Sequence, residues 1–397
     1  MRASVVLSAL VAVLVGFGGT VALIVTAAEA LGADAAQTTS WVTAICLATA
    51  ATTAVLSVAH RIPVMTAWST PGAALIAAAA GTVSLQSAIG AFIAAGALIV
   101  LTAMIRPIGA LIERIPTALA AAMLAGVLFR FATAIFEQAQ LEPALVLPLL
   151  AIFLLARLVS PAGAVLVALA AGLVLAVSLG LAEGMRFAPE VSTLTFIAPE
   201  FDAAVLIGVG LPLYLVTMAG QNLPGFAVLR ASGYTAPTRS ILATTGFASI
   251  VIAFFGAHTA NLGAITASIC TGPEAHPDPT KRWLCGPVYA AGYLVLAAVG
   301  ASVVTLIGAM PAALIATIAG VALLGPLVNA LGSALSPPEA RLPATLTLVV
   351  TASGIVLGGI GSAFWGLAAG LIVLALQAGA ERVRSAREAR KRAETGA

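Results

Sequence analysis

The stretch VMTAWSTPGAALIAAAA, residues 64–80, lies within a long apolar run, but its centre, residues 69–72, reads STPG. A helix that crosses a membrane needs about 20 continuous apolar residues, whereas Pro and Gly disfavour a helix interior. Thr70 followed by Pro71 is the pattern of an N-cap residue and the first helical position. The preceding residues are short, β-branched or aromatic, which favours an extended segment. The sequence therefore predicts that the span 62–80 is extended in its first half and helical in its second.

The composition of the chain places it in a membrane. Of its 397 residues 61% are hydrophobic and 8% are charged, and the mean hydropathy is +1.12. A water-soluble core cannot bury this much apolar surface. We predict an all-α polytopic membrane protein whose fourteen spans cover residues 4–28, 40–58, 62–80, 84–105, 115–136, 143–159, 161–182, 203–222, 240–256, 257–270, 285–308, 311–332, 342–358 and 361–380.

The loop charges support this count and give an orientation. Short cytoplasmic loops are enriched in Lys and Arg, so we expect both termini in the cytoplasm. The basic tail 381–397 would then touch anionic lipid rather than nucleic acid. The basic residues placed on the cytoplasmic side are Arg2, Arg61, Arg106, Arg114, Arg157, Arg230, Arg239, Lys281, Arg282, Arg341 and those of the tail. The charged residues placed on the outside are acidic except for Arg130 and Arg186.

Three pairs of similar strings indicate an internal repeat. GFG at 16 resembles GVG at 208, PTALAAAMLAGV at 116 resembles PAALIATIAGV at 311, and LAAGLVLA at 169 resembles LAAGLIVLA at 367. The halves 1–182 and 201–380 are joined by a periplasmic linker, 183–200. Seven spans is an odd number, so the second half is expected to be inverted relative to the first, as in secondary transporters.

The repeat places a second interruption in GAHTANLGAITASIC, residues 256–270, where Asn261 corresponds to Thr70 and Gly263 to Gly72. Asn is also a favoured N-cap residue, so the span 257–270 is predicted to be extended and then helical. Two helix N-termini would face one cavity near the midplane, each with free N–H groups and a partial positive charge. Such an arrangement binds anions.

The predicted spans carry no Asp, Glu, Lys or Arg near their centres. Backbone N–H groups and neutral side chains are therefore expected to hold an anion, and Phe17 and Tyr214 are candidate wall residues for an apolar ring. The predicted substrate-binding residues are Thr66, Trp68, Ser69, Thr70, Gly72, Gln221, Asn222, Thr259, Asn261 and Gly263.

Several of these assignments have structural alternatives. The STPG cluster is also consistent with a simple kink, and Trp68 with a residue that fills core volume. Gln221 and Asn222 are as consistent with bonds between helices as with substrate contacts. His258 is a candidate proton carrier, and equally a neutral histidine bonded to a backbone carbonyl.

Metal and enzyme functions fit the sequence poorly. Cys270, Cys285 and His276 lack the spacing of a zinc site and are expected to be free thiols and a loop histidine. The three Asp residues, at 34, 202 and 278, do not cluster as Mg²⁺ ligands for a lipid-diphosphate enzyme would. No nucleotide-binding loop is present. We therefore expect a transporter without a metal or other cofactor, and not an enzyme.

Three strings resemble the benzoate/proton symporter (BenE) family of bacterial inner-membrane transporters: TAWSTPGAALIAAAAG from 66, QNLPGFAVLRASGY from 221 and GAHTANLGAITASICTGPEAHPDPTKRW from 256. The resemblance covers essentially the whole chain. It implies import of benzoate or a similar aromatic carboxylate, driven by the proton gradient and achieved by alternating access. Transport or exchange of another organic or inorganic anion, such as sulfate, is the alternative.

The resemblance also implies kinship with the seven-plus-seven fold of nucleobase and sulfate transporters. In that fold a core domain, spans 1–4 and 8–11, moves against a gate domain, spans 5–7 and 12–14, and the relatives suggest a homodimer. Nucleobase transporters place acidic residues on the eighth and tenth spans, whereas this chain has Gln221, Asn222 and Asn261 there. This departure argues against a nucleobase substrate and leaves the proton-coupling residue unidentified.

Overall fold

The structure is a computed structural model that describes residues 2–105, 116–161, 163–182, 190–358 and 360–395, with the backbone alone after residue 381. The described residues do not include residues 183–189 of the predicted linker, nor Arg106, Arg114 and Arg186. The first half of the chain forms α1 (Ala3–Gly18), α2 (Val21–Ala30), α3 (Ala35–His60), β1 (Thr66–Trp68), α4 (Thr70–Ala78), α5 (Leu85–Met104), α7 (Thr117–Leu141), α8 (Pro143–Val159) and α9 (Ala164–Ser178).

The second half begins with a composite helix in which two π-helical turns, η1 and η2, interrupt the α-helical pattern. The elements are α10 (Ala203–Val205), η1 (Leu206–Gly210), α11 (Leu211–Thr217), η2 (Met218–Asn222), α12 (Leu223–Ala231), α13 (Thr238–Ala253), β2 (Ala260–Leu262), α14 (Ala264–Thr271), η3 (Pro279–Leu284), α15 (Cys285–Ala298), α16 (Gly300–Gly308), α17 (Ala312–Leu335), η4 (Pro338–Ala340), α18 (Arg341–Ser353) and α19 (Ser362–Thr395).

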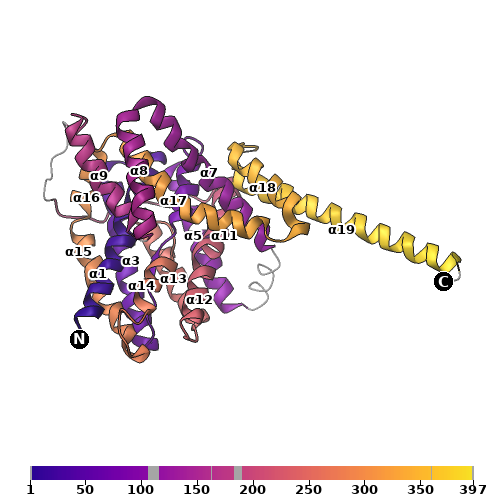
Figure 1. The fold of residues 1–397 in the computed structure, drawn as a ribbon, viewed down its shortest axis with the longest axis horizontal. Helices are drawn as coiled ribbons and strands as arrows, with labels where there is room; N and C mark the ends of the chain where they lie inside the picture. Colours follow the sequence, from indigo (N-terminus) through magenta and orange to yellow (C-terminus); the bar gives the residue numbers. More distant parts are fainter. Residues whose placement is uncertain (1, 106–115, 162, 183–189, 359, 396–397) are drawn as a thin grey trace.

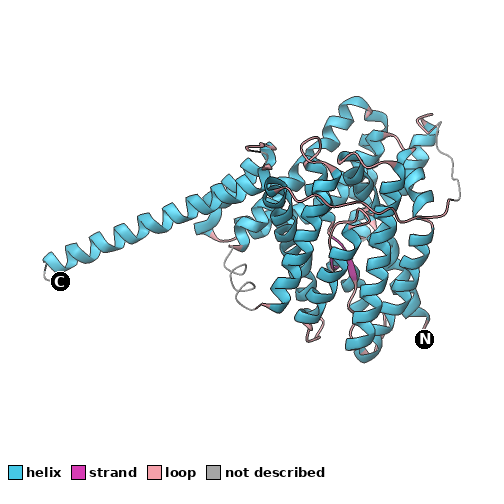
Figure 2. Cartoon of the chain, turned by 180° about the vertical axis from the view of Figure 1, so that it is seen from behind, coloured by secondary structure: helices cyan, strands magenta, loops and turns pink. Residues whose placement is uncertain are grey.

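The two short strands pair with each other inside the helix bundle, as Figure 2 shows. The pairing of β1 with β2 is antiparallel, with Ala67 opposite Asn261. Each strand is followed directly by a short helix, β1 by α4 and β2 by α14. The prediction that both interrupted spans are extended and then helical is thus confirmed, and the pairing satisfies backbone groups that a membrane interior would otherwise leave unpaired.

The helices pack in two groups. α3 packs against α15 and α5 against α13, while α1 and α2 contact α14 and α4 respectively. In the other group α7 packs against α17, α8 against α9, and α18 against α19. A separate apolar core joins α7, α8, α9 and α17 around Leu149, Phe153 and Leu314. The strand pair lies in the first group, so the site described below is built mainly on that group.

Seven helices in the described residues are long and apolar enough to cross a membrane, and an eighth candidate is a helix pair bent by 60° between α15 and α16. Helices α8, α9 and α13 are apolar but shorter. The chain is therefore a polytopic helical membrane protein, and the prediction of fourteen spans goes beyond this count. The predicted first span is interrupted at Gly19 and Thr20, between α1 and α2.

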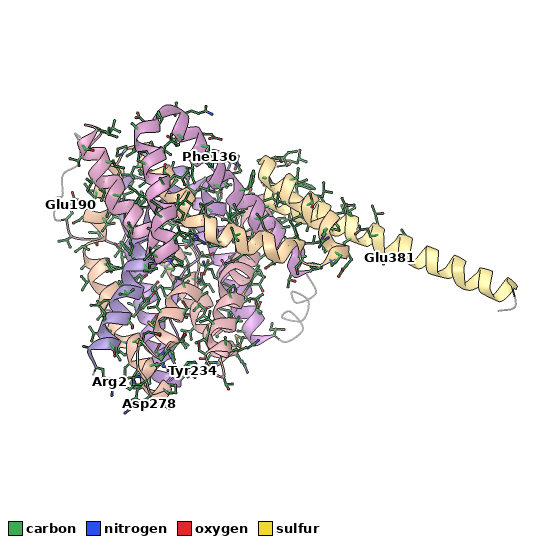
Figure 3. The ribbon with its side chains drawn as sticks, viewed as in Figure 1. Arg2, Phe136, Glu190, Tyr234, Asp278 and Glu381 are labelled. Carbon is green, nitrogen blue, oxygen red and sulfur yellow. The ribbon has the colours of Figure 1, made fainter. Side chains whose placement is uncertain are left out.

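The two ends of the bundle separate residues that the sequence assigned to opposite sides of the membrane. Arg2, Tyr234 and Asp278 lie at the lower end in Figure 3, and Phe136 and Glu190 lie in the upper half. Helix α19 leaves the body of the protein and carries the C-terminus far from it (Figure 1). The predicted basic tail thus continues the last helix without a break.

Candidate functional site

The N-terminus of α4 is capped by Ser69 and not, as the sequence predicted, by Thr70. Ser69 has extended backbone, and its Oγ accepts a hydrogen bond from the Gly72 N–H at 3.0 Å. Both residues are good caps and Pro71 is tolerated at either early position, so the local pattern could not separate them. The Ser69 N–H donates to the carbonyl of Thr259. In the first turn only the N–H of Thr70 is left without a partner among the described residues.

The N-terminus of α14 is uncapped. Asn261 was predicted as its cap but lies in β2, and Gly263 occupies the cap position without a side chain to accept a bond. The N–H of Gly263 donates to the carbonyl of Met65, which fixes the cap against the first half of the chain. The first three N–H groups of the helix, from residues 264–266, have no partner among the described residues. An uncapped helix start offers an anion three donors and the positive end of the helix dipole.

A cavity adjoins both helix starts. Its lining residues are Val15, Gly16, Thr20, Ala67, Trp68, Thr70, Gln221, Gly263, Ala264, Ile265 and Thr266. No charged side chain is among them. The space open to the centre of a water-sized atom is about 70 Å³, smaller than roughly 300–1,000 Å³, which is typical of small-molecule pockets. An aromatic substrate would therefore require the walls to move apart from the conformation seen here.

Trp68 forms the aromatic wall of this cavity. Its indole Nε1 donates to Thr20 Oγ1 at 3.0 Å, and its ring meets Phe17 and Tyr293 edge to face, with centroids 5.9 and 6.0 Å away. Such an arrangement holds the indole in one orientation. Neither of the other two predicted wall residues lines the cavity. Phe17 packs behind Trp68, and the Tyr214 hydroxyl is bonded to Thr102.

Thr66, a predicted ligand, faces α3 instead of the cavity. Its Oγ1 is bonded to Thr52 Oγ1 at 2.7 Å and Thr53 Oγ1 at 2.6 Å, and it donates to the Thr49 carbonyl at 3.0 Å. The side chain is fully buried. These bonds use the hydroxyl within the protein and anchor β1 to α3.

Three further predicted residues also hold the scaffold together. Thr259 Oγ1 is bonded to Thr217 Oγ1 at 2.9 Å, and Asn222 Oδ1 accepts from the Leu262 N–H at 3.0 Å. A Cβ at Gly72 would come within 2.7 Å of Leu213 Cδ1 and 2.9 Å of Ser69 Cβ, so Gly72 serves close packing at the start of α4. None of the three lines the cavity.

Two neighbouring amide side chains in the π-helical turn η2, Gln221 and Asn222, have different surroundings. Asn222 turns toward β2, whereas Gln221 is half-buried, lines the cavity and has no hydrogen-bond partner among the described residues. A π turn inserts an extra residue into a helix, which rotates the side chains on it, and such turns are frequent at functional sites. Of the predicted residues, the cavity thus brings together Trp68, Thr70, Gln221 and Gly263.

Asn261 lies in β2, opposite the cavity-lining Ala67 of β1, and does not itself line the cavity. Its Nδ2 donates to the Leu262 carbonyl at 3.2 Å and approaches the Trp68 carbonyl at 3.5 Å. Its Oδ1 is buried and has no partner among the described residues. The amide therefore supports the strand pair, and its free oxygen is a polar group that the protein leaves unsatisfied.

His258 uses both ring nitrogens within the protein. Its Nδ1 accepts from Trp41 Nε1 at 3.2 Å, so Nε2 carries the proton that it donates to the Ser69 carbonyl at 3.0 Å. The imidazole is fully buried, with Trp41 and Phe92 as ring neighbours. This geometry describes a neutral histidine that holds the α4 cap, the second of the two interpretations left open by the sequence.

Sequence reasoning missed Thr20, Thr266 and Tyr293. The first two line the cavity, and the Tyr293 hydroxyl lies beside it without a hydrogen bond of good geometry in the part of the chain that the structure describes. Thr20 lies in the break between α1 and α2, Thr266 in α14 and Tyr293 in α15. A hydroxyl residue in such an apolar stretch gives no local signal of function. The three cysteines are free and buried, and the described residues contain no cluster of His, Cys, Asp or Glu that could hold a metal ion.

Comparison with known proteins gives matches over nearly the whole chain. Residues 1–376 match the family model described as benzoate membrane transport protein. The chain is 41% identical to the inner membrane protein YdcO of Escherichia coli (strain K12), over 92% of this chain and 93% of that protein. It is 34% identical to the benzoate membrane transport protein of Acinetobacter baylyi, over 93% of this chain and 94% of that protein.

Solved structures with a similar fold are anion transporters by title. The transmembrane domain of a cyanobacterial bicarbonate transporter, BicA, superimposes with a TM-score of 0.62 at 15% identity, covering 93% of this chain and 97% of that one. Murine Solute Carrier 26 family member A9, an anion transporter in the inward-facing state, gives a TM-score of 0.58 at 13% identity, over 95% and 68% of the two chains. At these identities the likeness establishes the fold.

Proposed function

This chain belongs to the benzoate membrane transport protein family, and on that premise we propose that it imports benzoate or a similar aromatic carboxylate together with protons. One observation carries the choice of substrate. The uncapped start of α14 presents three free N–H groups to a cavity that has no charged side chain and one aromatic wall. A carboxylate brings the negative charge that this site lacks, and a ring matches the wall.

In the proposed complex the carboxylate accepts hydrogen bonds from the N–H groups of residues 264–266 and of Thr70. Gln221 lies on the same cavity and adds a neutral donor. The ring packs against Trp68, whose orientation Thr20 and Phe17 fix. Because the donors are backbone groups, their positions are set by the strand pair and require no reorganisation of long side chains.

We further propose fourteen spans in two inverted repeats, with a core domain that carries the site past a gate domain by alternating access. The helix contacts support the repeat, because equivalent helices of the two halves make equivalent contacts. The pair α3 and α15 corresponds to α13 and α5, and the pair α1 and α14 corresponds to α11 and α4. Every residue that lines the cavity belongs to the predicted spans 1, 3, 8 and 10 or adjoins them. The substrate would therefore move with the core domain.

The proposed location is the bacterial inner membrane, with both termini in the cytoplasm and a homodimer as the assembly. The relative in Escherichia coli is named an inner membrane protein, and the positive-inside rule supports the orientation of the termini. Protons are the proposed energy source, without another cofactor. The lining of the cavity offers no titratable side chain among the described residues, so the proton-coupling residue stays unidentified. His258, the candidate named from the sequence, is bonded through both ring nitrogens within the protein, and its replacement tests that role.

A second candidate function is transport or exchange of a small inorganic anion such as sulfate or bicarbonate. The narrow cavity, with about 70 Å³ for water-sized atoms, suits a small anion in the conformation seen here. The fold neighbour BicA is titled a bicarbonate transporter. An aromatic wall adds nothing to the binding of these ions, so competition by acetate, sulfate and bicarbonate distinguishes the two functions.

The test is uptake of radiolabelled benzoate into proteoliposomes with an imposed inward proton gradient, beside sulfate and uracil. Thr70→Ala removes a side chain that lines the cavity beside the bound carboxylate, and Asn261→Ala removes the amide that supports the strand pair. Both should reduce gradient-dependent benzoate accumulation. The matched control is Thr345→Ala, which removes an exposed threonine hydroxyl on α18. Benzoate movement no faster than leak, with accumulation of another anion, would show that the substrate is wrong.

A further inference from the structure

Tyr293 in α15 has a hydroxyl group that makes no hydrogen bond of good geometry among the described residues, although the Tyr289 hydroxyl is a polar neighbour. The side chain is fully buried, and its Oη has no hydrogen-bond partner among the described residues. Buried polar groups in folded proteins are nearly always paired, because an unpaired one loses its bonds to water without compensation. A buried hydroxyl without a protein partner therefore points to an acceptor that a ligand brings.

This hydroxyl lies next to two residues that line the cavity, although Tyr293 itself is not one of the lining residues. A Cβ placed on Gly16 would lie 2.9 Å from Tyr293 Oη and 3.0 Å from Thr266 Cγ2, so both atoms adjoin the same point. Gly16 and Thr266 line the cavity. The hydroxyl is thus beside Thr266 in the first turn of α14, where three backbone N–H groups are free, and the absence of a side chain at residue 16 lets Tyr293 Oη and Thr266 Cγ2 approach α1 closely.

We propose that the Tyr293 hydroxyl donates a hydrogen bond to the carboxylate of the bound substrate. One carboxylate oxygen accepts from the N–H groups at the start of α14, and the other accepts from Tyr293 Oη. This inference rests on the proposed function, because it takes the bound anion to be an aromatic carboxylate. It also predicts that the site prefers benzoate to benzamide. Benzamide is a neutral amide of the same shape, but it has only one acceptor oxygen and so loses one of the two sets of bonds.

Tyr289, one turn before Tyr293, is a matched control. The two rings are neighbours, with centroids 4.8 Å apart, but the Tyr289 hydroxyl donates to the Thr66 carbonyl at 3.0 Å. Removing it leaves a buried carbonyl without this donor, which should lower stability. Removing the unpaired Tyr293 hydroxyl should leave the stability of the empty protein unchanged or higher.

The experiment uses the full-length protein in lipid nanodiscs. Binding of benzoate and benzamide is measured by calorimetry, and thermal unfolding is measured without ligand, for the wild type, Tyr293→Phe, Tyr289→Phe and Gly16→Ala. Tyr293→Phe should weaken benzoate binding roughly ten- to a hundredfold, the range for a hydrogen bond to a charged group, with a smaller effect on benzamide and no loss of Tm. Gly16→Ala should weaken benzoate binding in the same direction, and Tyr289→Phe should lower Tm with little effect on benzoate.

Unchanged benzoate affinity in Tyr293→Phe would overturn the inference. So would equal losses for benzoate and benzamide together with a lower Tm, because they indicate a deformed cavity. If the wild type binds acetate, sulfate or bicarbonate but not benzoate, the proposed function is wrong. The affinity of Tyr293→Phe for the anion that binds then tests the inference: a tenfold or greater loss supports the hydroxyl as an anion ligand. If no anion binds, both are wrong.

Discussion

The imidazole of His258 donates from Nε2 to the backbone carbonyl of Ser69, with 3.0 Å between the two atoms. Ser69 is the residue whose side chain caps α4, so the histidine of one half of the chain positions the helix start of the other. Its Nδ1 is meanwhile occupied by the Trp41 N–H. A second proton on the ring would have to displace that N–H within a fully buried site.

We therefore predict that replacing His258 affects stability more than proton coupling. His258→Gln retains an amide that can replace one of the two bonds, and should lower Tm and the uptake rate. The proton gradient should still drive benzoate accumulation in the protein that folds. Uptake with and without an imposed gradient, in liposomes of equal protein content, checks this. If His258→Gln still exchanges benzoate across the membrane but no longer accumulates it, the histidine carries the proton.

Thr66→Val should act on the scaffold and not on substrate binding. The change keeps the shape of the side chain but removes a hydroxyl bonded to Thr52, Thr53 and the Thr49 carbonyl. A loss of about 1 kcal/mol in the free energy of unfolding is expected for a hydrogen bond between elements of a membrane protein. The KM for benzoate should stay within about twofold, below the roughly tenfold that a lost charged contact produces. A large rise in KM at unchanged Tm would instead make Thr66 a ligand.

The interruptions of the third and tenth spans could be predicted because Pro71, Gly72 and Gly263 act on the local backbone. The pairing of β1 with β2 could not, because it joins residues near 67 to residues near 261 and depends on the whole fold. The exact caps were also missed: Ser69 and Thr70 are equivalent as local signals, and Asn261 has a cap preference that strand pairing overrides.

The composition of the site was predicted more poorly than its place. The sequence around residues 218–222 does not indicate the π-helical turn η2, in which Gln221 lines the cavity while Asn222 accepts a hydrogen bond from β2, a segment 40 residues later. Hydroxyls such as those of Thr20 and Thr66 have the same local pattern, yet one lines the cavity and the other is bonded away from it. The inverted repeat and the division into core and gate stay predictions.

Trp68→Leu should reduce selectivity for aromatic substrates. The indole packs between Phe17 and Tyr293 on the cavity wall, so its removal deletes the ring contact and the bond to Thr20. Benzoate uptake should fall by more than acetate uptake, and the measurement is the ratio of the two rates. Tyr214→Leu is the matched control, because this aromatic residue lies away from the cavity and should leave the ratio unchanged. Equal losses for benzoate and acetate in Trp68→Leu would make the indole a core residue only.

Asn261→Asp should convert the anion site into one that rejects anions. The side chain lies two residues before the cap of α14, and its Oδ1 has no partner among the described residues. A carboxylate there would occupy the positive end of the helix dipole and repel a second negative charge.

We expect benzoate uptake to fall by about tenfold or more, the change produced by roughly 1.4 kcal/mol. The Tm should fall, because a carboxylate at this fully buried position loses the Nδ2 bond to the Leu262 carbonyl and is costly to bury, so uptake is compared at equal amounts of folded protein. The loss should deepen as pH rises, since a higher pH ionises the new carboxyl group, and it should diminish as pH falls and the group becomes neutral. Asn261→Ala, which removes the amide without adding charge, should show a smaller loss with no such added pH dependence. Uptake rates of the two variants across a pH series, each divided by the wild-type rate at the same pH, decide the point. An Asp variant that transports benzoate at the wild-type rate at high pH would place the bound anion elsewhere than at the start of α14.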